Sequence, residues 1–595
     1  QNSTKKADYG PSMLLLRAGA AAFVIAICCA LLGWTELALL YADPYTAERD
    51  ISTNVGIDQL TFFGISLNKL VFDVQGYTNT SLPTIEYFLN MKYGLFMLDL
   101  YWNHFTQKWQ LCPGPIPANE TADLAQNVEV FWNNNTYTCL PGFTVTDVFH
   151  RVESYLASTN VLLDADVVQF ALNLKSIYLE EKVVYLNGTQ SSRNATKTVV
   201  DTTPDAYKAY GQDYLSLGNS TLKDSLGAVE SYMFTPTDLL LIQLTESVQY
   251  PTQYTYLFSL YKRVFPFVLS NAIHNSSTGY NVSSEDQNTI FFPSVDFAPW
   301  VALHGHSSLA QNISRTLNGS NSAIFEDWKL NTQFRMVIDN DDSPLTNKTA
   351  SMYLQSGFSV ILNSSNAGYD SEQDILDMAN AYTPAAFWSW APGLFHEDLL
   401  YNSTASYAKH YEENEDWYAE GSQTAYLCVS VTKNGWALQN CYDKIRGACQ
   451  NTLDPFSWVL TEDIGSYVDW TTQSGCPEGY SVSIPLLSLE QFSLLSHLVS
   501  HNVLYPVWVD MNDITVPGCY VSGGPYALCP YQEAITTRNF VKSLAPSSLV
   551  ALFLIILIFC ERIFLKTPIH TNRKRHWKRK IADYYKENDY EGVPL

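Results

Sequence analysis

A carboxylate stands at the end of a short apolar run, where α/β barrels hold the residues that do chemistry. Residues 95–98 (LFML) follow the turn at 92–94 (KYG) and precede Asp99. A run this short, bounded by a turn, is typical of a buried parallel strand. Asp99 then falls at the carboxyl end of the strand, the end at which barrels place working residues. The sequence thus predicts a barrel site centred on Asp99; the alternative is a carboxylate that only caps or orients the following loop.

The elements that must position Asp99 alternate between helix and strand. This alternation indicates parallel β/α units and an α/β fold class. Apolar residues at helical spacing predict helices at 84–91, 143–156, 236–248 and 374–382. Short apolar runs predict strands at 60–65, 109–111, 166–177, 288–292, 334–338, 358–362 and 386–390.

Two apolar segments bracket the rest of the chain. The first, residues 13–41, has the length of a signal peptide or a short membrane anchor, and the second, residues 544–560, precedes a basic block. The positive-inside rule puts both flanks in the cytosol and the long middle across the membrane. We therefore expect a signal anchor in 1–45, a transmembrane helix in 543–565 and a basic cytosolic tail in 566–595. Cleavage of the first segment is the alternative, and it leaves the sidedness of the middle unchanged.

Glycosylation acceptors support the same topology. Between the two apolar segments the sequence contains thirteen N-x-S/T triplets. One triplet is a weak signal, but thirteen in one segment indicate a lumenal or extracellular protein that carries N-linked glycans. The acceptors are Asn79, Asn119, Asn134, Asn187, Asn194, Asn219, Asn275, Asn281, Asn312, Asn318, Asn347, Asn363 and Asn402.

Cysteine usage indicates an oxidising compartment. Three of the 11 cysteines, Cys28, Cys29 and Cys560, lie in the apolar segments. The other eight form an even set, for which disulfides are the default outside the cytosol. None of them forms a C-x-x-C pair, which disfavours a zinc ribbon or a redox motif. The eight are Cys112, Cys139, Cys428, Cys441, Cys449, Cys476, Cys519 and Cys529.

The charge distribution argues against nucleic acid as a direct partner. The formal net charge is −24, yet the tail 561–595 carries +4 and residues 1–41 carry +1, which leaves −29 for the middle. A surface this acidic repels phosphate backbones. The basic tail is better explained as a topology signal with some affinity for anionic lipid.

The second half of the chain changes in composition. An acidic stretch, residues 406–424, predicts a linker. Residues 425–535 hold six of the eight lumenal cysteines and no glycosylation triplet, which predicts a compact disulfide-rich module. Dense cross-links without sugars also suggest that a partner or the membrane covers one face of the module.

The C-terminal stretch is the most specific part of the sequence. Residues 508–530 read WVDMNDITVPGCYVSGGPYALCP, and 538–541 (RNFV) and 591–594 (EGVP) follow. This pattern closely resembles the fungal family called maintenance of telomere capping protein 6, and more loosely the resemblance extends back to 56–60 (GIDQL). It implies a glycoprotein of the endoplasmic reticulum or a connected endomembrane. The family name implies a link to telomere capping, which must be indirect for a lumenal acidic protein.

The N-terminal region carries a second pattern. The order of three segments resembles barrels of the phosphatidylinositol phospholipase C type. The segments are residues 61–68 (TFFGISLN), 81–102 (SLPTIEYFLNMKYGLFMLDLYW) and 143–156 (FTVTDVFHRVESYL). The resemblance implies a TIM-type (β/α) barrel over residues 50–405.

The same resemblance implies that the catalytic groups have been lost. In that superfamily a His follows the first strand, an acidic residue ends the second and a His-Gly follows the third, and the two His act as acid and base. Here the first position is Leu67-Asn68, the third is 112–114 (CPG), and only Asp99 keeps its type. We therefore expect a vestigial site at Leu67, Asn68, Asp99 and Tyr101, with no catalytic residue, metal or cofactor.

A third resemblance concerns the disulfide-rich module. Residues 426–450 look like the closing half of a C-type lectin-like domain and residues 476–491 look like an opening half, in permuted order. The resemblance implies an α+β module, whereas six cysteines alone allow fifteen pairings. Pairing of Cys112 with Cys139 is inferred from this chain alone. The implied bridges are Cys428–Cys441, Cys449–Cys476 and Cys519–Cys529.

Other chemistry-bearing residues have simpler explanations. His304 and His306 could share a strand face as metal ligands, but no third ligand is evident, so a polar loop is favoured. The turn at 339–342 (DNDD) lacks the spacing of an EF-hand. Trp388 and Trp390 could stack a sugar or a lipid headgroup, but filling the barrel at its last strand is the preferred interpretation.

These patterns together predict a non-catalytic endomembrane glycoprotein. It would bind, stabilise or scaffold a membrane protein or a lipid-handling partner, without nucleic acid. One alternative is a lumenal phosphodiesterase or glycosidase that uses Asp99 with a second carboxylate or a His from elsewhere. The other is a lectin-like carbohydrate-binding protein that uses residues 425–535.

Overall fold

The chain forms two compact units, residues 1–529 and 530–595. Both expected membrane segments and the acidic linker lie outside the described residues. Within the described ranges, no helix combines the length and apolarity needed to cross a membrane. In the second unit the described residues form one helix, α18 (Arg573–Glu587). The computed structural model describes residues 44–103, 108–114, 124–132, 135–179, 181–185, 196–200, 207–211, 222–245, 250–269, 284–292, 297, 299–301, 305–319, 322–331, 333–364, 371–392, 426–473, 475–503, 506–516, 518–531 and 573–587.

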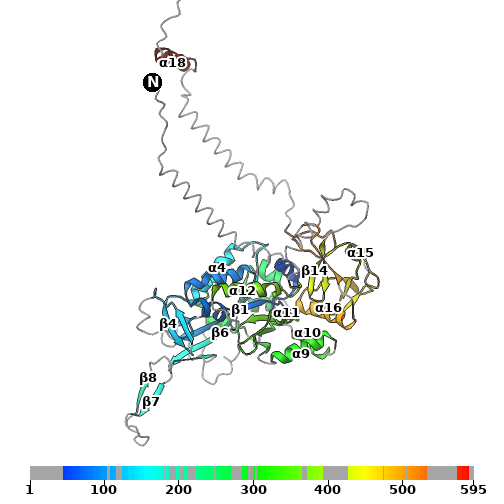
Figure 1. The fold of residues 1–595 in the computed structure, drawn as a ribbon, viewed down its shortest axis with the longest axis horizontal. Helices are drawn as coiled ribbons and strands as arrows, with labels where there is room; N and C mark the ends of the chain where they lie inside the picture. The colour runs from blue at the N-terminus through cyan, green and yellow to red at the C-terminus, as the bar shows by residue number, and fades with distance from the viewer. Residues whose placement is uncertain are drawn as a thin grey trace, which may run out of the picture. The chain divides into compact units, whose positions relative to one another are not determined.

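A parallel sheet forms the centre of the first unit. Its strands run in the order β10-β6-β2-β1-β12-β11, and each neighbouring pair along this path is parallel. The sheet is half of a TIM-type barrel (Figure 1). Its strands are β1 (Phe63–Ser66), β2 (Leu95–Asn103), β6 (Val168–Leu179), β10 (Val264–Val268), β11 (Met336–Ile338) and β12 (Ser359–Leu362), and β3 (Lys108–Gln110) and β9 (Tyr207–Gly211) add antiparallel pairs to β2 and β6.

Side-chain packing joins the two edges of the half-barrel. Phe265 of β10 stacks on Phe334, which precedes β11, with 5.3 Å between ring centroids. Phe297 packs against Phe334 and against Phe267 of β10, at 4.9 and 4.4 Å. These rings belong to a buried cluster on one face of the sheet. Aromatic contacts therefore close the barrel where strand pairing stops.

Helices cover the other face of the sheet, and α4 shows why the sequence forms them. Its buried positions recur at helical spacing, and its start has a capping box: the Asp147 carboxylate accepts from the Thr144 backbone N–H at 2.7 Å and from its hydroxyl at 2.8 Å. Phe149 packs on Phe170 of β6 at 5.0 Å. The longer helices of this region are α3 (Leu82–Asn90), α4 (Val145–Ser158), α6 (Pro236–Thr245), α9 (His306–Leu317), α10 (Ser322–Leu330), α11 (Asn347–Gln355) and α12 (Glu372–Tyr382).

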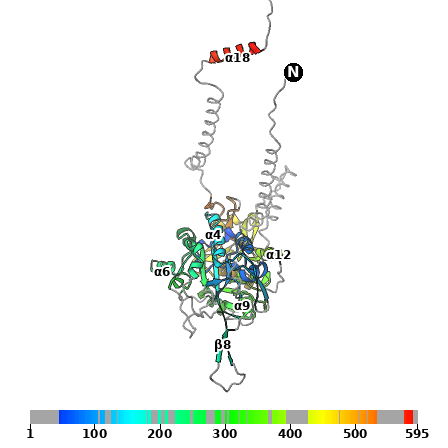
Figure 2. The same ribbon diagram turned by 90° about the vertical axis from the view of Figure 1, so that its left-hand side faces the viewer.

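Two antiparallel hairpins extend from the half-barrel. One consists of β4 (Val128–Trp132) and β5 (Asn135–Cys139). The other, β7 (Glu181–Tyr185) with β8 (Thr196–Val200), projects from the body of the unit in both views (Figures 1 and 2).

The disulfide-rich region is α+β. It contains two three-stranded antiparallel sheets, in the orders β14-β13-β18 and β16-β15-β17. Its disulfides are the three pairs that the lectin resemblance implies, and the fourth disulfide, Cys112–Cys139, lies in the half-barrel region. The elements are β13 (Tyr426–Thr432), β14 (Gly435–Asn440), β15 (Ala448–Asn451), β16 (Trp458–Leu460), α15 (Tyr467–Gln473), β17 (Tyr480–Val482), α16 (Ser488–Ser500) and β18 (Val507–Asn512).

The half-barrel and the disulfide-rich region share one core. The Trp436 backbone N–H donates to Ser389 O at 2.7 Å, and the Ala391 N–H donates to Trp436 O at 2.9 Å. Helix α16 adds bonds from the Ser488 hydroxyl to Leu354 O and from the Ser496 hydroxyl to Thr316 O, at 2.8 and 3.0 Å. One buried cluster includes side chains from both regions. They therefore pack as parts of one compact unit.

Three of the expected strands differ from the structure. Residues 386–390 do not join the parallel sheet; Trp390 bridges to Trp436 in the disulfide-rich region. Residues 284–289 form helix α7, which overlaps the strand expected at 288–292. The strand near Cys112 is β3, an antiparallel partner of β2, so the parallel strand that follows β2 is β6. Short apolar runs do not reveal their pairing partner, which explains the first and third differences. Periodicity also does not separate a short buried strand from a segment of buried helix, which explains the second.

Candidate functional site

Asp99 lies in the middle of β2, which continues to Asn103, so the expectation that the strand ends at Asp99 is wrong. Asp99 is two residues beyond Met97, the last residue of β2 that pairs with β1, and its carboxylate is held in an ion pair. The side chain is 10% exposed. Its Oδ2 lies 2.7 Å from Lys175 Nζ, and its Oδ1 accepts a hydrogen bond from Asn173 Nδ2 at 2.6 Å. Both partners come from β6, and strand alternation puts Asp99, Asn173 and Lys175 on one face of the sheet. Each carboxylate oxygen therefore already has a donor.

The residues after the first strand are used to hold Asp99 in place. Asn68 Oδ1 accepts from the Asp99 backbone N–H at 2.7 Å, and Asn68 Nδ2 donates to Asp99 O at 3.2 Å. Leu67 is fully buried in the hydrophobic core. Leu67 and Asn68 occupy the position at which the phospholipase C-type resemblance expects the first His. Here Leu67 packs in the core, and Asn68 links β1 to β2.

Tyrosines surround the ion pair. Lys175 Nζ lies 5.3 Å from the centroid of the Tyr101 ring. Burial, followed by the charges of Asp99 and Asp73, raises the pKa of Tyr101 well above its ordinary value. Tyr77 donates to Asp73 Oδ1 at 2.7 Å. Burial, followed by the Asp73 charge, likewise raises the Tyr77 pKa. Both phenols are therefore protonated near physiological pH; Tyr77 donates to Asp73, and the Tyr101 hydroxyl accepts from Lys175 Nζ at 3.5 Å.

Cys112 occupies the position at which the phospholipase C-type resemblance expects the second His, and it helps to fix a hairpin beside the Asp99–Lys175 pair. Cys112 is bonded to Cys139, the last residue of β5. The Tyr77 N–H donates to Thr138 O at 2.8 Å, and the Tyr77 and Tyr137 rings lie 6.0 Å apart. The β4–β5 hairpin therefore packs beside the Asp99 group and is fixed there by a disulfide.

A second carboxylate at this end of the sheet orients a loop. Asp339 follows β11 and is 3% exposed. Its oxygens accept from the backbone N–H groups of Asn363 and Leu345, the latter at 3.3 Å. Burial raises the pKa of Asp339 to about 6. Because both oxygens bind backbone donors, Asp339 fixes the loops after β11 and β12.

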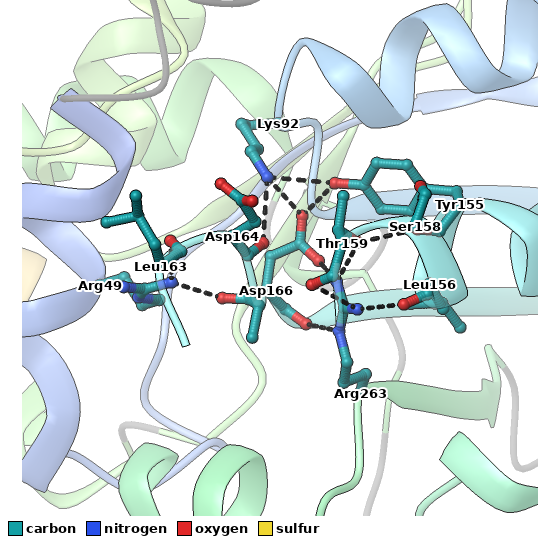
Figure 3. A network of polar contacts seen from close by, with 11 residues as sticks. Arg49, Lys92, Tyr155, Leu156, Ser158, Thr159, Leu163, Asp164, Asp166 and Arg263 are labelled. Carbon is teal, nitrogen blue, oxygen red and sulfur yellow. Dashed lines mark hydrogen bonds and ion pairs between the residues drawn. The ribbon is translucent and has the colours of Figure 1, made fainter. Parts of the chain in front are cut away.

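The opposite end of the sheet carries a denser polar network (Figure 3). A charged residue precedes each of three strands at this end: Lys92 precedes β2, Asp166 precedes β6 and Arg263 precedes β10. The Asp166 carboxylate pairs with both cations, and its Oδ2 lies 3.2 Å from Lys92 Nζ. Tyr155 of α4 donates to the same carboxylate. Burial alone would raise the Asp166 pKa, but Lys92 and Arg263 lower it. A fully satisfied network at the amino ends of barrel strands ties strands and helices together.

The remaining sequence candidates are structural within the described residues. Trp388 and Trp390 are buried and pack edge-on against Trp436, 5.5 and 5.8 Å away. His304 lies outside the described residues, and the buried ring nitrogens of His306 have no hydrogen-bond partner. No group of three or more potential metal ligands occurs in the described part of the chain.

Five of the thirteen glycosylation acceptors fall in the described residues. Asn79, Asn318 and Asn347 are exposed, and Asn312 and Asn363 are half-buried. The other eight lie outside the described residues: Asn119, Asn134, Asn187, Asn194, Asn219, Asn275, Asn281 and Asn402.

Sequence reasoning found Asp99, Tyr101 and Asn68 but missed the partners on β6. Asn173 and Lys175 alternate with the buried residues Leu172 and Leu174 inside an otherwise apolar strand. Polar residues at every second position of a buried strand point to one face. This alternation in the sequence could have identified Asn173 and Lys175 as polar residues on one face of a buried strand.

A partial TIM-type barrel with an ion-paired carboxylate at its mouth defines the class of protein. A family described as "MTC6 partial TIM-barrel domain" matches residues 36–388. Proteins named maintenance of telomere capping protein 6 are similar over nearly the whole chain. The protein of Candida albicans (strain WO-1) is 37% identical, and the match covers 92% of this chain and 94% of the relative. The proteins of Candida tropicalis and Debaryomyces hansenii are 37% and 33% identical, and these matches cover 94% and 95% of this chain and 96% of each relative. The chain belongs to the maintenance of telomere capping protein 6 family. No solved structure matches it.

Proposed function

We propose that the chain is a non-catalytic binding protein of the endomembrane lumen. The proposal rests on what occupies the positions at which barrels of the phospholipase C type hold their two catalytic His residues. Leu67 packs the core, Asn68 binds the backbone of Asp99, and Cys112 is in a disulfide. General acid–base hydrolysis needs groups that are free to exchange protons beside the substrate. In this mouth the one retained acid is neutralised by Lys175.

The neutralised carboxylate is also a poor nucleophile or metal ligand. Freeing Asp99 would leave the Lys175 charge, 24% exposed as a side chain, without its partner. Separating partly buried charges in this way is costly. The Asp99 group is therefore better suited to holding β1, β2 and β6 together than to turnover.

The proposed location rests on sequence and on the disulfides. Four disulfides fit an oxidising compartment. Three acceptor asparagines of the described residues are exposed, as glycan attachment requires. With the two apolar segments as anchors, the bulk of the chain is lumenal and the basic tail is cytosolic. The chain would contact its partner in the membrane or at the disulfide-rich region.

The proposed role is to stabilise or scaffold a membrane protein or a lipid-handling complex. The relatives are named for maintenance of telomere capping. We extend that role to this chain as an indirect effect, because an acidic lumenal protein does not bind nucleic acid.

Partner isolation tests this proposal. The full chain is purified from its native host in mild detergent, and its co-purifying proteins are quantified. The proposal expects one membrane protein or lipid-handling protein at near-equal molar amount, retained by the Asp99→Asn variant. A chain that purifies alone, and whose asparagines carry no glycan by mass spectrometry, would contradict both the role and the location.

A further inference from the structure

The first described residues begin where the first apolar segment ends. Residues 44–51 are helical, and Pro44 follows the apolar segment 13–41 by three residues. Three residues span at most about 10 Å. If that segment is a membrane anchor, as the proposed function holds, the helical segment 44–51 starts beside the bilayer. Whatever packs against this segment is then close to the membrane as well.

One exposed loop is attached to this segment by Arg49. The Arg49 side chain is 3% exposed and donates through Nη1 to Leu163 O at 2.8 Å and to Ala165 O at 2.7 Å (Figure 3). The loop presents three consecutive apolar side chains to solvent, with Val161 53%, Leu162 66% and Leu163 51% exposed. A contiguous exposed apolar group marks an interaction site more often than an isolated one does.

A second exposed loop is held at the start of the same segment. Pro44 O accepts from Trp390 Nε1 at 3.3 Å, and the Trp390 ring packs edge-on against Tyr520 at 5.3 Å. Tyr520 belongs to the loop closed by the Cys519–Cys529 disulfide. This loop exposes Tyr526 and Leu528, at 83% and 79%.

The second loop is also the last part of the first unit before the other apolar segment in the sequence. Leu528 precedes the apolar segment 544–560 by sixteen residues. Pro44 and Arg49 are about 7.5 Å apart along the helix axis. Two exposed apolar loops thus flank one short helical segment, which follows the first apolar segment of the sequence after three residues.

We propose that Val161–Leu163 and the Tyr526/Leu528 loop form a membrane-contact surface that inserts into the interfacial region of the bilayer. Residues 160–164 (NVLLD) and 519–529 (CYVSGGPYALC) contain no Lys or Arg. The attraction is therefore hydrophobic and does not require anionic lipid. Leucine supplies apolar area for this region, and tyrosine combines an apolar ring with a polar hydroxyl.

This surface sets the orientation of the half-barrel. The 160–164 loop precedes β6, so it lies at the amino ends of the parallel strands, with the Lys92–Asp166–Arg263 network. The Asp99 mouth lies at the carboxyl ends and therefore faces away from the bilayer, into the lumen. Membrane contact at the amino ends keeps lipid headgroups away from the mouth.

Site-directed fluorescence of the full chain tests the surface. Cys28, Cys29 and Cys560 are replaced by Ala, and Leu162→Cys is labelled with an environment-sensitive fluorophore in phosphatidylcholine nanodiscs. The matched control is Leu453→Cys, whose native side chain is 94% exposed in a turn. We expect the emission at position 162 to shift to shorter wavelength and to be quenched at least twofold by lipids with a nitroxide near the headgroup. The label at position 453 should keep its aqueous emission and remain unquenched.

The outcomes separate this inference from the proposed function. Incorporation into nanodiscs with the same aqueous emission at both positions overturns the contact surface and leaves the anchored topology intact. A shielded label at position 162 that nitroxide lipids do not quench assigns the surface to a protein partner and also overturns it. A chain that stays soluble without detergent and does not enter nanodiscs overturns the membrane topology itself.

Discussion

At the residue scale the Asp99–Lys175 pair accounts for the chemistry of the mouth. Both carboxylate oxygens have donors, and the nearby Tyr101 phenol stays protonated. In the proposed function, an acid that is bound in this way positions strands and does not act on a substrate. Its contribution is measurable as stability.

Removing the cation should destabilise the fold more than removing both charges. Lys175→Met leaves the Asp99 carboxylate, 10% exposed as a side chain, without its ion partner. We expect a loss of about 1–3 kcal/mol in the free energy of unfolding, below the value for a fully buried pair because Lys175 reaches solvent. The double variant Asp99→Asn/Lys175→Met should lose less than Lys175→Met alone, and therefore less than the sum of the single losses. Denaturant unfolding of all four proteins checks this, and simple additivity would show that the pair is not coupled.

Glu48 should make stability depend on pH. Its carboxylate is buried, and burial raises its pKa from 4.5 to about 8 despite hydrogen bonds from the Ser389 backbone N–H and hydroxyl at 2.8 and 2.6 Å. Because the folded pKa lies above the unfolded one, the proton stabilises the fold fully below about pH 4.5, and this contribution is lost as pH rises through 8. The slope is at most about 1.4 kcal/mol per pH unit.

A neutral isostere is the control for this effect. Thermal melts between pH 5 and pH 8 should show a steeper fall in stability for the native chain than for Glu48→Gln. Equal slopes in the two proteins would mean that Glu48 does not titrate in this range.

At the scale of elements, the Cys112–Cys139 disulfide should hold the β4–β5 hairpin over the mouth. It closes a loop of 27 residues. Replacing both cysteines by Ser should lower stability by about 3–4 kcal/mol, mainly by loosening the unfolded chain. Limited proteolysis should then cleave the hairpin before the rest of the unit. The Cys519–Cys529 pair, which is separated by 10 residues, is the control, because its removal should leave the hairpin protected.

The elements that sequence patterns predicted well are those with long or bounded signals. Helix α4 has a cap and a regular apolar stripe, and β2 begins directly after a turn, so the existence of both elements was predictable. The end of β2 was not, because the strand expected to stop before Asp99 continues to Asn103. The pairing of residues 386–390 with Trp436 was not, because pairing depends on contacts between distant parts of the chain. The site was half predictable for the same reason: Asp99 stands out as a carboxylate after an apolar run, whereas Lys175 becomes its partner only once β6 lies beside β2.

At the scale of the whole molecule, the half-barrel and the disulfide-rich region depend on each other. Trp436 is fully buried between Trp388, Trp390 and Gln491, whose Oε1 accepts from Trp436 Nε1 at 3.0 Å. Phe492 of α16 packs on Trp328 of α10 at 5.9 Å. Each of these two side chains thus packs against aromatic rings of the half-barrel region. Neither region therefore has a complete core alone.

An isolated disulfide-rich region should fail to fold cooperatively. Residues 425–531 secreted alone should bind a hydrophobic dye and lack a sharp thermal transition, whereas residues 44–531 should show one transition. The disulfides are present in both, so they are not the variable. Two separate transitions in the longer chain would contradict the shared core.

The central claim, that the mouth is not catalytic, is tested most directly by turnover. The full chain, purified from its native host, is assayed against phosphatidylinositol and glycerophosphodiesters beside Asp99→Asn. The account predicts no hydrolysis above background for either protein, together with a lower melting temperature for the variant. Hydrolysis by the native chain that disappears in Asp99→Asn while the variant remains folded would contradict it.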